Sequence, residues 1–376
     1  MKQTFRKLAA ALAAAVLLLC LGGGQAAASG GVSGELVIYS SMYPFALAMM
    51  DEALKAEFPD LKPGNGDSFF IYGGSTSLIN EIYRGMKAGR LECDMMLVAE
   101  PSLALELKEA GYLEKVEIPD AASVLRFPYD EEGYWYPVRV CNMVLAYNPE
   151  LEADWAARGV SIPRTFAAFA RDKSLKGLIG MGDPMFSGTT FAAVVSLIQA
   201  NHYGRDYMIK LARNEVKLLS GSASIAGVQE GTLAAVMILE ESVLKALKDA
   251  EDAGTPLTNL KCIYPDDGVI LIPSPVMTVA DKYSWNGNSA AAAAVEKWLL
   301  TAEAQEIILK AYMHSVFASM DGIPYGSMDT KALMAKDLGV NWENAYQARE
   351  SINTAWSEIV LVQKQKMRQV DTRLAR

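Results

Sequence analysis

Residues Val138 to Asn148 read VRVCNMVLAYN, and residues Gly268 to Ala280 read GVILIPSPVMTVA. Both stretches are long and apolar, and Pro273 and Pro275 exclude a helix interior from the second because proline removes a backbone donor. We therefore expect two long extended segments that cross between two parts of the chain. The parts of the chain before, between and after these two segments indicate the fold that the segments connect.

The part before the first crossing segment alternates short apolar runs with helical patterns. Each run ends in small or polar residues, and the alternation is typical of a parallel sheet. The runs are Glu35 to Ser41, Phe69 to Tyr72 and Asp94 to Ala99, and the helical patterns are Pro44 to Phe58, Ser77 to Ala88 and Pro101 to Ala110.

The same plan recurs between the crossing segments, and two long helical patterns follow the second one. The repeated elements are the runs Gly177 to Gly182, Val216 to Ser220 and Ala234 to Leu239 with helices over Thr189 to Tyr203 and Ser224 to Glu230, and the late helices are Ala290 to Met313 and Trp342 to Arg368. For the tail over Asp337 to Arg376 we expect packing on the first lobe, with docking to a partner as the alternative.

The chain has 376 residues, more than the ~100 to 200 of a typical domain, so two lobes are expected. We predict an α/β clam-shell with one lobe from residues 34–138 plus 274–376, and a second from residues 139–273 that includes the hinge strands. Ligands of open α/β sheets bind beyond the carboxyl ends of the strands, so we place the binding cleft between the lobes.

Composition narrows the class of function. Apolar residues make up 51% and charged residues 21%, as in ordinary globular proteins. The net charge of −9 falls to −12 once the leader cations Lys2, Arg6 and Lys7 are removed. We therefore expect no binding to nucleic acid, because that binding depends on positive charge.

The N-terminus has the pattern of a signal peptide over residues 1–28. The leader cations precede a 14-residue apolar run, Leu8 to Leu21, which is shorter than the ~20 residues that span a bilayer. Ala26 to Ala28 predict cleavage before Ser29 and a periplasmic protein. Lipid attachment through Cys20 is the alternative, which the bulky Leu19 disfavours.

Cysteines and histidines predict no metal site. Cys93, Cys141 and Cys262 remain after the leader, without the spacing of a metal motif, and we expect buried free thiols. The chain has two histidines, which makes a zinc site improbable.

Small hydroxyl-bearing residues follow the predicted strands, where helices begin. Free backbone N–H groups and the helix dipole favour an anion there, and serine and threonine add neutral donors. On its own, each loop is equally well explained as a helix N-cap. The candidate ligand-binding residues are Ser40, Ser41, Ser75 and Thr76 in one lobe and Ser187, Gly188, Thr189, Thr190 and Ser222 in the other.

Charged and aromatic residues complete the predicted site. Carboxylates at strand ends would accept hydrogen bonds from hydroxyl or amine groups of a ligand, although Asp267 also fits a simple turn. A cation on an apolar strand needs a partner or an anionic ligand. The additional candidates are Glu100, Asp183, Glu240 and Asp267, with Arg139 and Tyr264.

The chain lacks the signatures of the common hydrolases and nucleotide-binding enzymes. It contains no GxSxG, no GxxxxGK[ST] and no GxGxxG motif. Paired carboxylates of a glycosidase stay possible in any acidic protein. We expect a protein that is not an enzyme and has no cofactor.

The chain resembles the extracellular solute-binding proteins of ABC importers, and most closely the type II cluster with ferric-ion, thiamine, phosphonate and hexose-phosphate binders. The resemblance covers about Glu35 to Ala318. Its motifs include LVIYSS, YGGSTSLINEI, CDMMLVAEPS, DPMFSGTTFAAVVSLI and AVEKWLLTAEAQEIILKA.

The resemblance implies a monomer that captures a solute by hinge closure and delivers it to a membrane permease and its ATPase. It favours a phosphorylated or other anionic organic solute held at the serine and threonine loops. Ferric iron is the alternative, although the chain lacks the adjacent tyrosines of iron binders and reads Ala311 to Phe317 there. A sensor that presents its closed form to a membrane kinase is a further alternative.

Overall fold

The structure, a computed structural model, describes residues 31–200, 203–320 and 322–374. The predicted signal peptide lies outside these residues. Within them, nine strands form one mixed sheet in the order β4-β2-β5-β11-β6-β9-β7-β8, and β10 pairs with β6. The strands are β2 (Ile38–Ser40), β4 (Phe70–Tyr72), β5 (Met95–Leu97), β6 (Tyr136–Tyr147), β7 (Ile179–Met181), β8 (Lys217–Leu218), β9 (Ala235–Leu239), β10 (Lys261–Ile263) and β11 (Ile270–Thr278).

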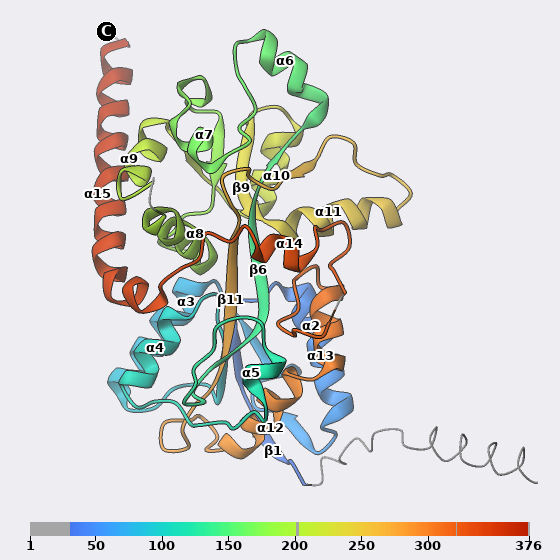
Figure 1. The fold of residues 1–376 in the computed structure, drawn as a ribbon. Coiled ribbons are helices and arrows are strands. Elements are labelled where there is room, and N and C mark those ends of the chain that lie inside the picture. Colours follow the sequence, from blue (N-terminus) through green and yellow to red (C-terminus); the bar gives the residue numbers. More distant parts are fainter. Residues whose placement is uncertain (1–30, 201–202, 321, 375–376) are drawn as a thin grey trace, which may run out of the picture.

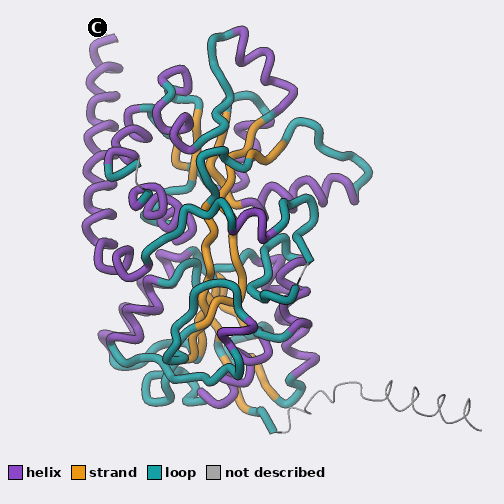
Figure 2. Tube along the Cα trace, in the orientation of Figure 1, coloured by secondary structure: helices purple, strands orange, loops and turns teal. Residues whose placement is uncertain are grey.

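The two predicted crossing segments are β6 and β11, which pair antiparallel along the middle of the molecule (Figure 2). Both strands are buried at every residue. One end of β11 pairs with β5, and the far end of β6 pairs with β9, so the two strands join the two halves of the sheet. The prediction of two hinge-crossing strands is confirmed. The predicted lobe boundaries stay a prediction.

Helices cover both halves of the sheet (Figure 1). In the lower half of that view are α2 (Pro44–Glu57), α3 (Ser75–Ala88), α4 (Ser102–Glu109), α5 (Ala121–Val124), α12 (Ser289–Leu299) and α13 (Ala302–Lys310). Above them are α6 (Glu152–Ala157), α7 (Phe166–Arg171), α8 (Gly188–Gln199), α9 (Asp206–Arg213), α10 (Gly221–Gln229) and α11 (Glu240–Asp252), and the chain ends with α14 (Thr330–Met334) and α15 (Trp342–Leu374). Short elements are β1 (Gly34–Leu36), which pairs with β3 (Leu61–Pro63), and the 3₁₀ turns Pro149–Leu151 and Lys173–Leu175.

Two predicted elements are divided by local hydrogen bonds. The strand predicted over Glu35 to Ser41 breaks at Val37, whose N–H group donates to buried Asp94 at 2.8 Å instead of to a neighbouring strand. The helix predicted over Ala290 to Met313 breaks before α13, because Thr301 caps that helix and accepts from the N–H group of Ala304.

The C-terminal helix α15 contacts both halves of the molecule. It packs against α4 in one half and against α9 in the other. Trp356 and Ile352 of α15 are buried, so apolar side chains contribute to the packing of this helix. The tail thus packs on the first lobe through α4, as expected, and it also packs on the second half through α9.

The three cysteines are unpaired thiols, as predicted, but only Cys93 and Cys141 are buried, whereas Cys262 is partly exposed. None of the described helices is long and apolar enough to cross a membrane.

Candidate functional site

A hollow of about 450 Å³ lies where the two halves of the molecule meet. The N-cap residues of four helices line it: Tyr43 of α2, Ser187 of α8, Ser220 of α10 and Leu239 of α11. Each helix start carries a partial positive charge and N–H groups without intrahelical partners. Asp183 is the one carboxylate among the lining residues, which include no lysine or arginine. The charge of the hollow therefore comes mainly from backbone dipoles.

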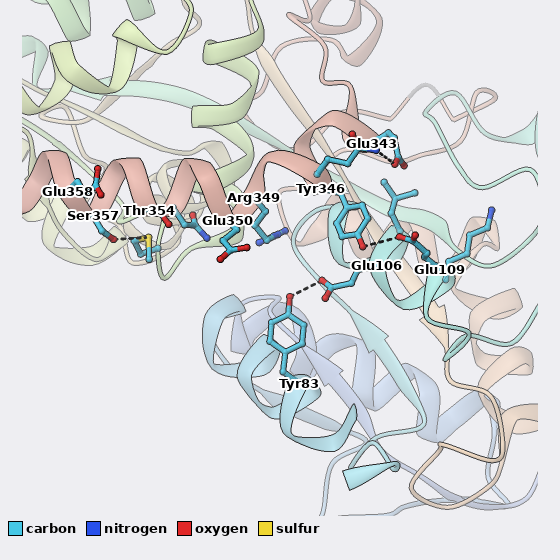
Figure 3. Close-up of a pocket in the computed structure, with 15 residues that line it drawn as sticks. Tyr83, Glu106, Glu109, Glu343, Tyr346, Arg349, Glu350, Thr354, Ser357 and Glu358 are labelled. Carbon is cyan, nitrogen blue, oxygen red and sulfur yellow. Dashed lines mark hydrogen bonds between the residues drawn. The ribbon is translucent and has the colours of Figure 1, made fainter. Parts of the chain in front are cut away.

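A larger hollow of about 1220 Å³ separates α3 and α4 from α15 (Figure 3). Its walls carry many carboxylates, and two of them accept hydrogen bonds from Tyr83 and Tyr346. Its two cations are already paired, Lys108 with Asp130 and Arg349 with Glu100. The cations of this acidic groove are bound within the protein, whereas the smaller hollow is lined by four helix N-caps, so the smaller hollow is the candidate site.

The start of α8 is a preformed set of donors. The Oγ atom of Ser187 accepts from the N–H group of Thr190 at 3.2 Å and from its hydroxyl at 3.0 Å, and lies 3.2 Å from Oγ1 of Thr189. The N–H groups of Gly188 and Thr189 have no acceptor among the described residues. Ser187 is thus both the N-cap of α8 and a residue that lines the hollow. The interpretation of this loop as a helix cap is therefore compatible with its interpretation as part of a ligand site.

The start of α10 supplies a second set. Its N-cap is Ser220, which accepts from the N–H group of Ala223 at 3.3 Å, and the N–H groups of Gly221 and Ser222 have no described acceptor. The sequence predicted a start at Ser224 and therefore selected Ser222, whose exposed side chain does not line the hollow. The preference of serine for N-cap positions was the available signal for Ser220.

Tyr43 contributes from the opposite half of the molecule, and sequence reasoning missed it. Its hydroxyl lies 2.9 Å from Oγ of Ser242 in the first turn of α11. Burial raises the pKa of Tyr43 to about 12, so the phenol stays protonated at neutral pH. Tyr43 precedes Pro44 at the start of α2, and proline at a first helical position was the signal for this helix start.

The starts of α3 and α8 touch directly. A Cβ atom on Gly188 would lie 2.9 Å from Oγ of Ser75 and 2.8 Å from Cβ of Ala99. Gly188 thus allows the two halves to meet. Ser75 lies at this contact but does not line the hollow, so its ligand role stays a prediction, and the side chain of Thr76 lies outside the described part of the structure.

The two serines after β2 differ in their surroundings. Ser40 is buried and its Oγ accepts from the N–H group of Met42 at 3.2 Å, so it serves the turn and not the cleft surface. Ser41 has a buried Oγ without a partner among the described residues. Ser41 keeps a hydrogen-bonding group without a described partner, whereas the ligand role of Ser40 stays a prediction.

Asp183 is held at the edge of the hollow by two donors. Its Oδ1 accepts from the N–H group of Met185 at 3.0 Å and from Nε1 of Trp356 at 3.3 Å. The helix α15 therefore contacts a residue that lines the site.

Two other predicted acidic residues serve the fold. Glu100 pairs with Arg349 of α15 and accepts from the N–H group of Ser102 at 2.8 Å. Asp267 accepts at 2.9 Å from the N–H groups of Phe166 and Ala167, and so caps α7. Neither residue lines the hollow, because helix starts and a cation elsewhere bind their carboxylates.

Glu240 is the centre of a buried network at the hinge. It accepts from Asn142 Nδ2 at 3.1 Å and from the hydroxyls of Ser327 and Tyr264, and its Oε2 lies 3.0 Å from His314 Nε2. Burial raises the pKa of Glu240, but these partners outweigh burial and lower it below the ordinary value. Tyr264 and Glu240 thus bond to each other, and neither lines the hollow, so their ligand roles stay a prediction.

Arg139 is also buried, on β6. Its Nη1 donates to Sδ of Met313 at 3.0 Å, and it forms no ion pair with any described residue. No described carboxylate therefore serves as the ion-pair partner of Arg139.

Comparisons with known proteins agree with this architecture. A family model described as bacterial extracellular solute-binding protein matches residues 93–334. No curated protein matches the chain by sequence. Solved structures with similar folds include the periplasmic binding protein AfuA from Actinobacillus pleuropneumoniae with fructose-6-phosphate bound, which is 20% identical with a TM-score of 0.70 over 87% of this chain and 98% of that chain.

Two further solved structures are also similar in fold. Iron-bound HitA from Pseudomonas aeruginosa is 18% identical, with a TM-score of 0.66 over 85% of this chain and 99% of that chain. The periplasmic binding protein P5PA is 18% identical, with a TM-score of 0.70 over 87% of this chain and all of that chain. The predicted two-lobed fold of type II periplasmic binding proteins is confirmed.

Proposed function

Because the chain belongs to the bacterial extracellular solute-binding protein family, whose members are not enzymes, we propose that it captures a small organic anion that bears a phosphate group. The solute occupies the hollow between the two halves of the molecule. The protein is the periplasmic substrate-binding component of an ABC importer, works as a monomer, and delivers the solute to a permease and its ATPase.

The observation that carries this proposal is the set of four helix N-caps around one hollow. A phosphate group accepts several hydrogen bonds at once, and the free N–H groups of α8 and α10 supply donors with a favourable dipole. The hydroxyls of Ser187 and Thr189 add neutral hydrogen-bonding groups at the same place, whereas the hydroxyl of Thr190 already donates to Ser187. The volume of about 450 Å³ suits a solute of the size of a sugar phosphate.

The contacts across the hollow support capture by closure. Tyr43 reaches Ser242 from the opposite half, and Ser75 meets Gly188 on another side. Both contacts join the lower half of the molecule in Figure 1 to the upper half. Movement about β6 and β11 would open these contacts and release the solute. The fructose-6-phosphate bound by AfuA is a ligand of the proposed chemistry in a protein with this fold.

Ferric iron is less well supported by the tyrosines of this chain. A tyrosine that binds ferric iron must do so as a tyrosinate, but burial and then the charge of Glu240 raise the pKa of Tyr264, whose hydroxyl is already bonded to Glu240. Burial also raises the pKa of Tyr312, whose ring packs against Phe45. The raised pKa values of Tyr264 and Tyr312 keep both phenols protonated at neutral pH, which disfavours their binding to a metal ion.

The test is a calorimetric titration of the chain without residues 1–28 with fructose 6-phosphate, inorganic phosphate and ferric citrate. We expect both phosphate ligands to bind and ferric citrate to leave the visible spectrum unchanged. Binding of ferric citrate with a tyrosinate absorption band, and no binding of either phosphate ligand, would replace this proposal with iron transport. A gene for a membrane kinase in place of permease and ATPase genes beside this one would favour a sensor.

A further inference from the structure

Arg349 is a cation on the buried face of α15. Ala345, Ile352 and Trp356 share that face at helical spacing and are 0%, 4% and 1% exposed, and the Arg349 side chain is 16% exposed. An arginine rarely occupies such a position unless its charge is paired. Figure 3 shows Arg349 on the side of α15 that faces α3 and α4. The partners of this guanidinium group therefore indicate what the residue does.

The guanidinium group bonds to the lower half of the molecule, where the loop after β5 enters α4. Nη2 of Arg349 donates to Oε1 of Glu100 and to Oγ of Ser102. Glu100 is 3% exposed, and its Oε2 accepts from the N–H group of Ser102 at 2.8 Å. Removal of one partner from a buried ion pair is costly, because the other charge stays buried without compensation. The bond between Arg349 and Glu100 is therefore a strong link between α15 and the lower half.

The helix α15 is itself attached to the upper half of the molecule on both sides of Arg349. Before the helix, the N–H group of Asn341 donates to Oε1 of Gln199 in α8 at 2.7 Å, and Nε2 of Gln199 donates to the carbonyl oxygen of Asn341 at 3.1 Å. Further along, Nε1 of Trp356 donates to Asp183 at 3.3 Å, and α15 packs against α9. These attachments indicate that Arg349 moves with the upper half.

Arg349 also lies beside the contact between the starts of α3 and α8. Its guanidinium carbon lies 4.4 Å from the ring centroid of Phe191, which is in the first turns of α8. Glu100 directly follows Ala99, and a Cβ atom on Gly188 would lie 2.8 Å from Cβ of Ala99. The guanidinium group therefore lies between a helix of the upper half and a loop of the lower half, at the place where the two halves meet.

We propose that Arg349 is a positioning residue that holds the two halves together, because its bonds to Glu100 and Ser102 form only while the lower half lies against α15. Separation of the halves about β6 and β11 would break these bonds and leave Glu100 without a cation. A second bond to the lower half, from Tyr346 to Glu109 at 3.0 Å, is exposed to solvent and contributes less. This inference rests on the proposed capture by closure, but it does not depend on which solute is captured.

Solution scattering from the chain without residues 1–28, measured without any solute, tests this role. Arg349→Met and Glu100→Gln each remove one charge of the pair. Arg84→Met is the matched control, because it removes the same charge from an arginine that pairs with Glu81 inside α3. We expect both pair variants to have a larger radius of gyration than the wild type, and the control to equal the wild type. Arg349→Lys keeps the positive charge and should give a smaller increase than Arg349→Met.

Binding kinetics and thermal unfolding complete the test. In Arg349→Met the closed form is less populated, so fructose 6-phosphate should dissociate faster, with a Kd about tenfold higher. A purely structural role would lower the melting temperature but leave the radius of gyration of the folded variant unchanged.

A wild-type radius of gyration in the folded pair variants would overturn the proposal. If Arg349→Met does not fold, Glu100→Gln and Arg349→Lys carry the same comparison. Failure of the wild type to bind fructose 6-phosphate would count against the proposed solute, whereas the scattering comparison without solute would still decide the role of Arg349.

Discussion

The hydroxyl of Tyr43 lies 2.9 Å from Oγ of Ser242 and joins α2 to α11 across the candidate site. These residues are 199 positions apart in the chain, on opposite sides of the first crossing strand. The bond is a direct link between the two halves at the wall of the hollow.

Tyr43→Phe should weaken solute binding without unfolding either half. The change removes one neutral hydrogen bond of the closed form, which contributes about 0.5 to 1.5 kcal/mol, or roughly a two- to tenfold increase in Kd for fructose 6-phosphate. Tyr312→Phe is the control, because the hydroxyl of Tyr312 bonds to no described residue. Calorimetry checks the result, and equal Kd values for the two variants would show that the link does not hold the closed form.

Gly188→Ala should hinder closure. The added Cβ would lie within 3 Å of Ser75 and Ala99, and such overpacking costs about 1 to 3 kcal/mol. We expect a Kd for fructose 6-phosphate that is about tenfold higher and a larger radius of gyration in solution scattering with ligand present. In the control Gly74→Ala, the nearest described atom would lie 3.9 Å away. A wild-type radius and Kd in Gly188→Ala would mean that these helix starts separate in the bound form.

Substitutions of Ser187 should separate its two roles. Ser187→Ala removes both the cap of α8 and a ligand donor, and should lower the free energy of unfolding by about 1 kcal/mol. Ser187→Gly loses the same hydroxyl but costs only a few tenths of a kcal/mol, because glycine is tolerated at N-caps. Both variants should bind inorganic phosphate more weakly. If only the alanine variant did so, the affinity change would follow from helix stability and not from the lost donor.

Asp267→Ala should reduce stability and leave binding unchanged. Its carboxylate caps α7 through two backbone N–H groups, and removal of such charged hydrogen bonds costs about 1.5 to 3 kcal/mol. A lower melting temperature with a wild-type Kd for fructose 6-phosphate is expected. A large loss of affinity at temperatures where the variant is folded would restore the ligand role that the sequence suggested.

Glu296, which lies away from the candidate site, should make the free energy of unfolding depend on pH. Burial raises its pKa to about 8 from the ordinary value of 4.5, and Thr278 donates to its Oε2 at 2.6 Å. The folded state therefore retains a proton that the unfolded state releases. This contribution to stability is complete below pH 4.5 and is lost as the pH rises to about 8, by up to about 1.4 kcal/mol per pH unit.

The matched variant for this prediction is Glu296→Gln, which cannot ionise. Its melting temperature should exceed that of the wild type at pH 8, and the difference should shrink toward pH 5. A difference that does not change with pH would show that Glu296 is already ionised in the folded protein.

The crossing strands were predictable because β6 and β11 are buried along their whole length. A strand that is buried on both faces has an uninterrupted apolar sequence. The prolines in β11 exclude a helix as the alternative interpretation of such a sequence. The start of α8 was predictable for a similar local reason, since Ser187 followed by glycine and two threonines is a strong helix-start pattern.

The side chains of the site were less predictable, because their partners lie far away in the sequence. Glu100 is bound by Arg349, and Asp267 by helix α7, about 100 residues or more distant in each case. A carboxylate looks equally available in the sequence whether it faces a ligand or a helix start. Tyr43 was missed for the converse reason, since its role depends on Ser242 being brought beside it.

The sequence by itself determined the two-lobed α/β architecture, the crossing strands and the helix starts that favour an anion, because these follow from hydrophobic pattern and local backbone chemistry. Tertiary structure alone decided which of those helix starts share a hollow and which carboxylates are already bound within the protein. These outcomes depend on burial and on hydrogen bonds between distant segments. Whether a polar group lacks a hydrogen-bond partner can be judged only when all of its neighbours are known.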